Sequence, residues 1–172
     1  ISPPLPGFDG DEILIPTTDA SEVYVFNKNG RHLRTVLALT GATLLEFHYD
    51  DAGRLTSIQD GNGLVTMIEH DASGNPTGIL APFGQHTSLT TTLDGFLASV
   101  ANPAGETTLL GYTGVGLLSS VTGPKGDTYS FTYDGAGHLL SASDPAGGST
   151  TLTYTNTGNG YEVQATTALG RV

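Results

Sequence analysis

The chain has 172 residues, a length that suits one domain. It contains no apolar run of about 18 residues, so no segment is predicted to span a membrane, and the absence of cysteine excludes disulfides and thiolate metal sites. A formal net charge of −11 disfavours binding to nucleic acid and to anionic membranes.

The N-terminal part is irregular. Residues 1–12 are rich in proline and glycine and are predicted to be linker-like. Residues 13–46 are expected to hold degenerate first hairpins: residues 13–15 could pair with residues 23–26 around Asp19, Ala20 and Ser21. A degenerate copy of the later repeat then follows, with turns at Gly30 and Gly41.

Residues 47–172 consist of six tandem copies of one unit. Two glycine columns recur every 21 residues, which is the mark of a stacked supersecondary unit. The first column is Gly53, Gly74, Gly95, Gly116, Gly137 and Gly158, and the second is Gly63, Gly84, Gly105, Gly126 and Gly147. The last copy has two extra residues between Gly158 and Gly170.

Both glycine columns predict tight turns. In the first turn, as at Asp50 to Gly53, an aspartate can bond its own backbone and the glycine is expected to hold positive φ. In the second, as at Asn102 to Gly105, a proline sets φ and glycine closes the turn. These glycines are therefore predicted to be structural.

The segments between turns are strand-like. They hold about 5 to 7 residues rich in Thr, Tyr, Phe, Val and Leu, so each copy is predicted to be a β-hairpin. Apolar residues two apart point to one side and form the predicted core column, which is Phe47, Tyr49, Ile68, Leu110, Tyr112, Phe131, Tyr133, Leu152 and Tyr154. Leu55 and Ile58 have opposite parity, which requires either a bulge or a long turn.

The predicted fold is all-β. It is an antiparallel meander of about seven 21-residue hairpins, or about 14 strands. We expect the sheet to curl or spiral, because open twisted sheets beyond about 10 strands usually do so.

The motif Tyr-Asp-x-x-Gly-x-Leu, at residues 49–55 and 133–139, is followed by Asp-Pro-x-Gly at residues 144–147. It resembles the YD repeat of bacterial Rhs proteins and teneurin-like chains. The resemblance implies a spiralling β-sheet shell, often around a C-terminal toxin or effector, in secreted or cell-surface proteins. His70 and Thr91 depart from the motif, because they stand in the tyrosine column.

The acidic turn residues Asp50, Asp51, Asp71 and Asp134 could ligate calcium or could stabilise the turns. The dense acidic loop of a calcium-binding hand is missing, which favours the turn role. No metal site and no cofactor are predicted.

Histidines offer a second metal hypothesis. His48 with Asp50, and Glu69 with His70, could form a pair on neighbouring repeats, but equivalent residues there lie about 9–10 Å apart, which favours a structural role. The other histidines, His32, His86 and His138, are expected to have no partner at catalytic spacing.

We expect no enzymatic activity and predict no catalytic residues, because no nucleophile motif departs from the repeat. The expected function is that of a structural repeat module in a secreted or surface shell or fibre. The alternative is an adhesive module that binds carbohydrate or protein through its tyrosine face, if Tyr49, Tyr112, Tyr133 and Tyr154 are exposed rather than packed in a core.

The predicted partner is a second copy of the chain or the remainder of a parent Rhs chain. The chain begins with Ile and stops within a repeat at Arg171 and Val172, so we expect a piece of a longer protein. Sheet edges near residues 13–26 and 171–172 would favour head-to-tail pairing into a homo-oligomer or filament.

Overall fold

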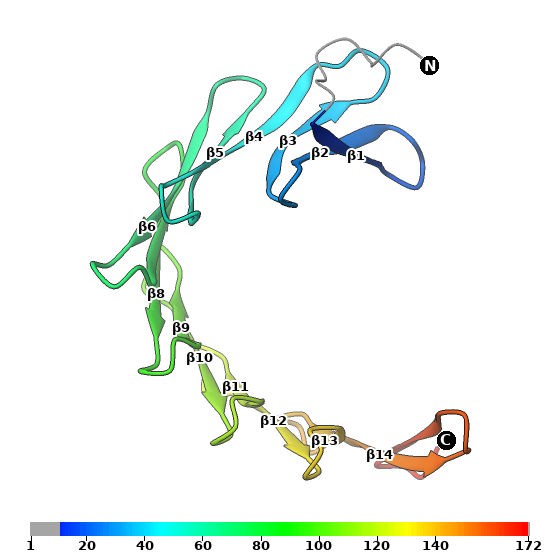
Figure 1. The fold of residues 1–172 in the computed structure, drawn as a ribbon. Coiled ribbons are helices and arrows are strands. Elements are labelled where there is room, and N and C mark those ends of the chain that lie inside the picture. The colour runs from blue at the N-terminus through cyan, green and yellow to red at the C-terminus, as the bar shows by residue number, and fades with distance from the viewer. Residues whose placement is uncertain (1–10, 172) are drawn as a thin grey trace. The chain divides into compact units, whose positions relative to one another are not determined.

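The computed structural model describes residues 11–171, and all regular structure in this range is β-strand (Figure 1). The chain divides into two compact units, Ile1–His86 and Thr87–Val172. The early strands are β1 (Glu12–Pro16), β2 (Glu22–Asn27), β3 (His32–Leu37), β4 (Thr43–Tyr49), β5 (Leu55–Asp60), β6 (Val65–His70) and β7 (Pro76–Leu80). The later strands are β8 (His86–Thr91), β9 (Leu97–Ala101), β10 (Thr107–Tyr112), β11 (Leu118–Thr122), β12 (Thr128–Tyr133), β13 (Leu139–Ser143), β14 (Ser149–Asn156) and β15 (Tyr161–Thr167).

The strand order confirms the predicted all-β antiparallel meander. The 15 strands follow one another in sequence order in one sheet. The N-terminal hairpin forms, with Ile13 opposite Phe26 in β1 and β2, and it supplies a strand beyond the 14 expected. The curl of the sheet stays a prediction. Within residues 11–171 no helix has the length and apolar character needed to cross a membrane.

Residues 1–10 of the predicted linker lie outside the described residues. Glu12, the last residue of the predicted linker, begins β1. Its carboxylate forms a bidentate ion pair with the Arg34 guanidinium of β3, with both nitrogen to oxygen distances at 2.8 Å. The pair reaches across β2 and fixes β1 to the sheet. The division into residues 13–46 and 47–172 stays a prediction.

Most hairpins share one turn geometry, seen at Asp50 to Arg54. The Gly53 N–H donates to the Asp50 carbonyl (2.9 Å), and the Asp50 N–H donates to the Arg54 carbonyl (3.0 Å). This is a type I turn followed by a left-handed glycine, a common hairpin connection. The eleven glycines of the two columns all have positive φ, including Gly53 at 83°.

A bulge resolves the parity mismatch that the sequence left open. Tyr49 pairs with Leu55 and His48 pairs with Ser57, so Thr56 has no opposite residue. The same shift recurs between Gly111, which pairs with Ser120, and Tyr112, which pairs with Leu118. Each bulge lets a leucine and an apolar residue three positions later face the same side of the sheet.

The last hairpin lacks this bulge. β14 and β15 pair without interruption from Thr150 and Thr167 to Asn156 and Tyr161. Its connection, residues 157–160, has positive φ at Gly158 and a hydrogen bond from the Thr157 N–H to the Gly160 carbonyl (3.0 Å). The two extra residues of the last copy therefore lengthen a regular hairpin.

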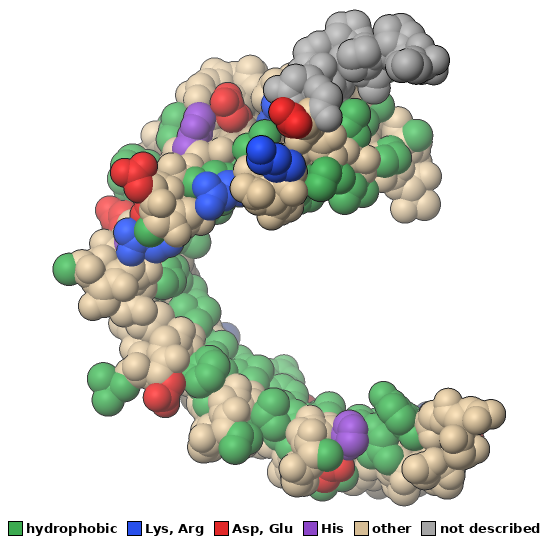
Figure 2. All heavy atoms as spheres, in the orientation of Figure 1, with side chains coloured by type: hydrophobic (Ala, Val, Ile, Leu, Met, Phe, Trp, Pro, Cys, Tyr) green, Lys and Arg blue, Asp and Glu red, His purple; other side chains and the backbone are tan. Residues whose placement is uncertain are grey.

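Burial is concentrated at the N-terminal end. The buried apolar side chains among the described residues are Val23, Val25 and Val36, in β2 and β3. All nine residues of the predicted core column are half-buried, because a single sheet layer covers them only through neighbouring strands. Figure 2 shows hydrophobic side chains gathered along one face of the second unit's strands.

Candidate functional site at the tyrosine junctions

The tyrosine column joins successive repeats through hydrogen bonds. The Tyr112 hydroxyl donates to the Leu97 carbonyl (2.8 Å), and the Tyr133 hydroxyl donates to the Leu118 carbonyl (2.7 Å). The Tyr154 hydroxyl likewise reaches the Leu139 carbonyl at 3.0 Å. Each tyrosine therefore ties its own repeat to the one before it.

The accepting carbonyl belongs to the bulge. Leu118 is the residue that pairs with Tyr112 at the bulge, where the backbone ladder is locally disrupted. The Tyr49 hydroxyl of the first regular copy donates to the carbonyl of His32 in the degenerate copy (2.8 Å), and His32 occupies the same bulge position, opposite Phe26. The spacing between tyrosine and leucine in the motif thus has a geometric origin.

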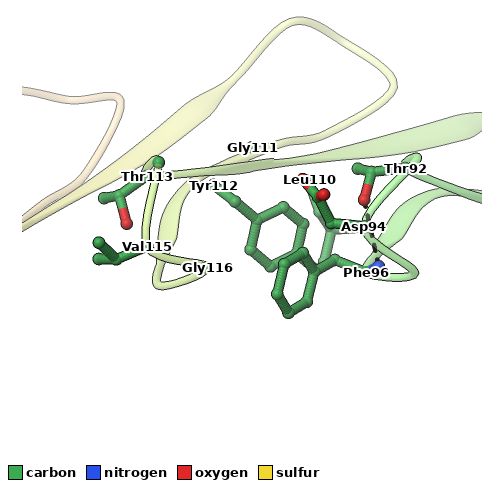
Figure 3. A pocket seen from close by; sticks show the side chains of 10 residues that line it. Thr92, Asp94, Phe96, Leu110, Gly111, Tyr112, Thr113, Val115 and Gly116 are labelled. Atoms are coloured by element: carbon green, nitrogen blue, oxygen red, sulfur yellow. Dashed lines mark hydrogen bonds between the residues drawn. The ribbon is translucent and has the colours of Figure 1, made fainter.

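A side-chain contact covers the rings of Tyr49, Tyr112 and Tyr154. In each case the residue after a turn glycine lies on the tyrosine of the next repeat. The Phe96 ring stacks on Tyr112 with centroids 5.0 Å apart (Figure 3), and the Arg31 guanidinium lies 4.8 Å above the Tyr49 ring. His138 packs against Tyr154 with centroids 5.0 Å apart.

This contact distinguishes Gly53, Gly74 and Gly116 from the second column, whereas Gly95 and Gly158 have no atom within 4 Å of the Cβ position. A Cβ atom at Gly116 would meet the Phe96 ring at 2.5 Å, and at Gly53 it would meet the Arg31 guanidinium. At Gly84 and Gly105, in the second column, no atom lies within 4 Å of the Cβ position. The second column needs glycine for its φ, whereas these first-column positions also need the space.

A hollow of about 540 Å³ opens beside the Phe96 and Tyr112 rings, with Thr92, Asp94 and Val115 on its walls (Figure 3). Val115 is 83% exposed, and Leu93, beside Asp94 in the turn, is fully exposed. Other first turns carry small or polar residues here, so the turn itself does not require these two apolar side chains.

The acidic turn residues are engaged by their own turns. Asp71 Oδ1 accepts from the N–H groups of Ser73 (2.8 Å) and Asn75 (2.9 Å). A hydrogen bond from the Asn75 side chain, followed by one from its backbone, lowers the pKa of Asp71. The pKa of Asp50 is lowered by hydrogen bonds from Arg54, backbone first. The pKa of Asp134 is lowered first by the His138 side chain.

Two histidines correct the expectation that they lack partners. His86 Nε2 lies 2.8 Å from Glu69 Oε2, and His138 Nδ1 lies 2.9 Å from Asp134 Oδ2. The first pair meets above Gly78, whose Cβ position lies 2.5 Å from the His86 ring. The signal in the sequence was Gly78 itself, because the equivalent position is serine in four other copies, at Ser57, Ser99, Ser120 and Ser141.

Copies with serine at the position of Gly78 show which contact the Glu69 and His86 pair replaces. Thr90 and Ser99 share a hydrogen bond of 2.6 Å between their hydroxyls, and so do Thr132 and Ser141. His48 is exposed on the polar face, whereas His70 is half-buried in the tyrosine column, so the two are not brought together. No cluster of three or more His, Cys, Asp or Glu side chains suited to a metal occurs within residues 11–171.

His32 lies among aromatic rings. It stacks on Phe26 with centroids 4.7 Å apart and packs against Phe47 at 4.2 Å. Burial lowers its pKa, which favours the neutral ring. His32 therefore packs as an aromatic residue at the first junction.

A family model described as Teneurin YD-shell matches residues 10–171. Shorter stretches are similar to curated teneurins. Teneurin-4 of Mus musculus is 38% identical over 64 residues, which cover 37% of this chain and 2% of that protein. Teneurin-1 of Homo sapiens is 38% identical over 69 residues, which cover 40% of this chain and 2% of that protein. The match thus spans a small fraction of either relative.

Solved structures with a similar fold include a Photorhabdus luminescens Tc holotoxin pore, with a TM-score of 0.55 and 16% identity over 87% of this chain and 9% of that chain. A TcdB2–TccC3 crystal structure without the hypervariable C-terminal region gives a TM-score of 0.56 and 18% identity over 84% of this chain and 9% of that chain. At these identities the likeness concerns the fold alone.

Proposed function

The chain belongs to the teneurin YD-shell family, and from that premise we propose that it forms part of the wall of a shell in a secreted or cell-surface protein. The wall is structural, and the proposal gives the chain no catalytic role. Turnover in a broad hydrolase screen would contradict that part of it.

The observation that supports this proposal is the tie between repeats. The hydroxyls of Tyr112, Tyr133 and Tyr154 each bond a backbone carbonyl of the preceding repeat. These side chains are committed to holding strands together, which suits a continuous wall. A tyrosine strip that presented its hydroxyls to a ligand would leave them unbonded.

The experiment is protease protection in the full-length protein that carries this segment. Changing Tyr112, Tyr133 and Tyr154 together to phenylalanine removes three ties and keeps the rings. We expect added protease to reach segments behind the wall faster in this variant. The matched control changes Tyr24, Tyr129 and Tyr161, which are exposed, to phenylalanine. Equal rates of cleavage in the two variants would contradict the proposal that the chain forms part of a wall.

The proposal includes self-association through the sheet ends. β1 and β15 are the outer strands, and Ile13, Ile15 and Tyr161 on them are exposed. Outer strands present unpaired backbone groups, and unlike ends favour head-to-tail pairing. Sedimentation velocity should show mass growing with concentration, and Val163→Lys on β15 should oppose it more than Ala146→Lys in an exposed turn. A 17.7 kDa monomer at every concentration would contradict association.

Adhesion is the second candidate function, and the hollow beside Phe96 favours it. Exposed Leu93 and Val115 border a site with an aromatic ring and the Asp94 carboxylate, which suits a sugar or a protein segment. A glycan array and pull-downs test it, with Leu93→Ser and Val115→Ser expected to abolish any binding found. Binding unchanged in both variants would exclude the hollow.

A further inference from the structure

Three asparagines in the chain directly precede a glycine, at positions 29, 62 and 159. An asparagine that precedes a glycine can lose its side-chain amide in a reaction with the neighbouring backbone, without an enzyme. The glycine backbone nitrogen attacks the asparagine side-chain carbonyl, and the side-chain nitrogen leaves as ammonia. The reaction needs a glycine N–H that can lose its proton and approach the side chain, so its rate depends on what holds that N–H.

Two of the three pairs are held by their turns. The Gly30 N–H donates to the Asn27 carbonyl, and the Gly63 N–H donates to the Asp60 carbonyl, both at 2.9 Å. The asparagines are fixed as well: the Asn62 N–H donates to Asp60 Oδ1 at 2.9 Å. In each case the glycine is the left-handed residue that closes a type I turn.

The third pair lies in the connection between β14 and β15, residues 157–160. Here Gly158, not Gly160, holds the left-handed position. Gly160 contributes its carbonyl to the turn, and its N–H makes no hydrogen bond within residues 11–171. Asn159 and Gly160 are both exposed, and nothing lies within 4 Å of the Gly160 Cβ position.

We propose that Asn159 is a site of spontaneous deamidation in the folded protein, whereas Asn29 and Asn62 are protected by their turns. The Gly160 nitrogen bonds to the Asn159 side-chain carbon, ammonia leaves, and a five-membered cyclic imide forms. Water then opens either carbonyl of the ring. The product is aspartate, or isoaspartate in which the main chain runs through the side chain. No oxidant or further reactant is needed.

The modification has consequences for the last hairpin. Either product adds a negative charge next to Glu162 in a chain whose net charge is already −11. Isoaspartate also lengthens the main chain by one carbon atom, which disturbs the short connection of residues 157–160. Tyr161, which packs on Tyr154 with centroids 5.7 Å apart, follows this turn directly. The modification therefore loosens the start of β15, at Tyr161.

The test is a time course of the purified chain at mildly alkaline pH, followed by peptide mapping with mass spectrometry. We expect deamidation at position 159 to run at least about tenfold ahead of positions 29 and 62. Labelling by a methyltransferase specific for isoaspartate should increase with the same time course and map to the same peptide. Equal rates at the three positions, or faster reaction at position 29 or 62, would overturn the proposal.

Two controls separate structure from local sequence. In concentrated urea the three positions should react at similar rates, and a lead of position 159 that persists in urea would overturn the structural explanation. Gly160→Ala hinders attack by the backbone nitrogen, and the φ of Gly160 is not positive, so alanine fits the turn. This variant should stop the reaction at position 159 and leave the other two positions unchanged.

Discussion

Tyr133 has two kinds of contact that can be separated by experiment. Its hydroxyl bonds the Leu118 carbonyl at 2.7 Å, while its half-buried ring packs in the apolar face. Tyr133→Phe keeps the ring and leaves the carbonyl without this donor. The free energy of unfolding should fall by about 0.5–1.5 kcal/mol, the net value of one hydrogen bond.

Tyr129 is the matched control on the same strand. It is 49% exposed, and its hydroxyl makes no hydrogen bond within residues 11–171. Tyr129→Phe should change stability by no more than about 0.5 kcal/mol. Urea denaturation measures both variants. Equal losses would show that the hydroxyl of Tyr133 does not tie the repeats together.

Ala20 carries backbone strain in the turn between β1 and β2. Its φ is 56°, and it is the one non-glycine residue with positive φ within residues 11–171. The left-handed region costs a residue with a Cβ atom about 1–2 kcal/mol, and glycine avoids most of this cost. Ala20→Gly should therefore stabilise the protein by about 0.5–1 kcal/mol after the added entropy of the unfolded chain. A lower melting temperature in calorimetry would contradict this.

At the scale of the element, each hairpin is shaped by its own turn and by the repeat before it. The side chain after one turn glycine occupies the space beside the next, as Phe96 does at Gly116. His70, which replaces the tyrosine in its copy, makes no side-chain hydrogen bond to a carbonyl of the preceding repeat within the described residues.

Gly116 and Gly105 provide a matched test of the two glycine columns. Their φ angles are 85° and 83°, so alanine is strained by about 1–2 kcal/mol at either position. Gly116→Ala must also displace the Phe96 ring and should cost clearly more than Gly105→Ala. In a double-mutant cycle, Phe96→Ala should remove the excess. The same unfolding free energy for both single variants would show that the Phe96 contact is unimportant.

At the scale of the whole molecule, hydrogen-bonded aspartates make stability depend on pH. The Asp19 carboxylate accepts from the hydroxyl of Thr17 and from the backbone and hydroxyl of Ser21, which lowers its pKa from 3.8 to about 2. The pKa values of Asp50, Asp71 and Asp134 are also lowered. A carboxyl group with a lowered folded-state pKa stabilises the fold above its unfolded pKa and loses that contribution as the pH falls through the folded value.

The urea midpoint should therefore fall as the pH is lowered from about 4 towards 2. Asp19→Asn removes the titrating group and should flatten part of this decline. A midpoint that stays constant or rises over this range would show that the turn aspartates do not contribute in this way.

The sequence alone determined the repeat, the hairpins and the turns. A fixed period and the local demands of proline, aspartate and left-handed glycine act within a few residues, so Gly53 and Asp50 identify a turn without knowledge of any neighbour. The family resemblance was predicted from the same local motif. The extra N-terminal hairpin of β1 and β2 was also foreseen, from alternating apolar residues around a short polar segment.

Only the tertiary structure decided which residues meet across repeats. The hydroxyl of Tyr133 on Leu118 and the Phe96 ring beside Gly116 depend on how one hairpin lies against the next. The parity of Leu55 and Ile58 left a bulge and a long turn open, and the pairing of β4 with β5 places a bulge at Thr56. The pair of Glu69 and His86 escaped detection because the two side chains come from strands on either side of β7 and meet only where Gly78 leaves room. A repeat period fixes which positions are equivalent, but contacts between unlike positions depend on register and twist, which only the folded sheet supplies.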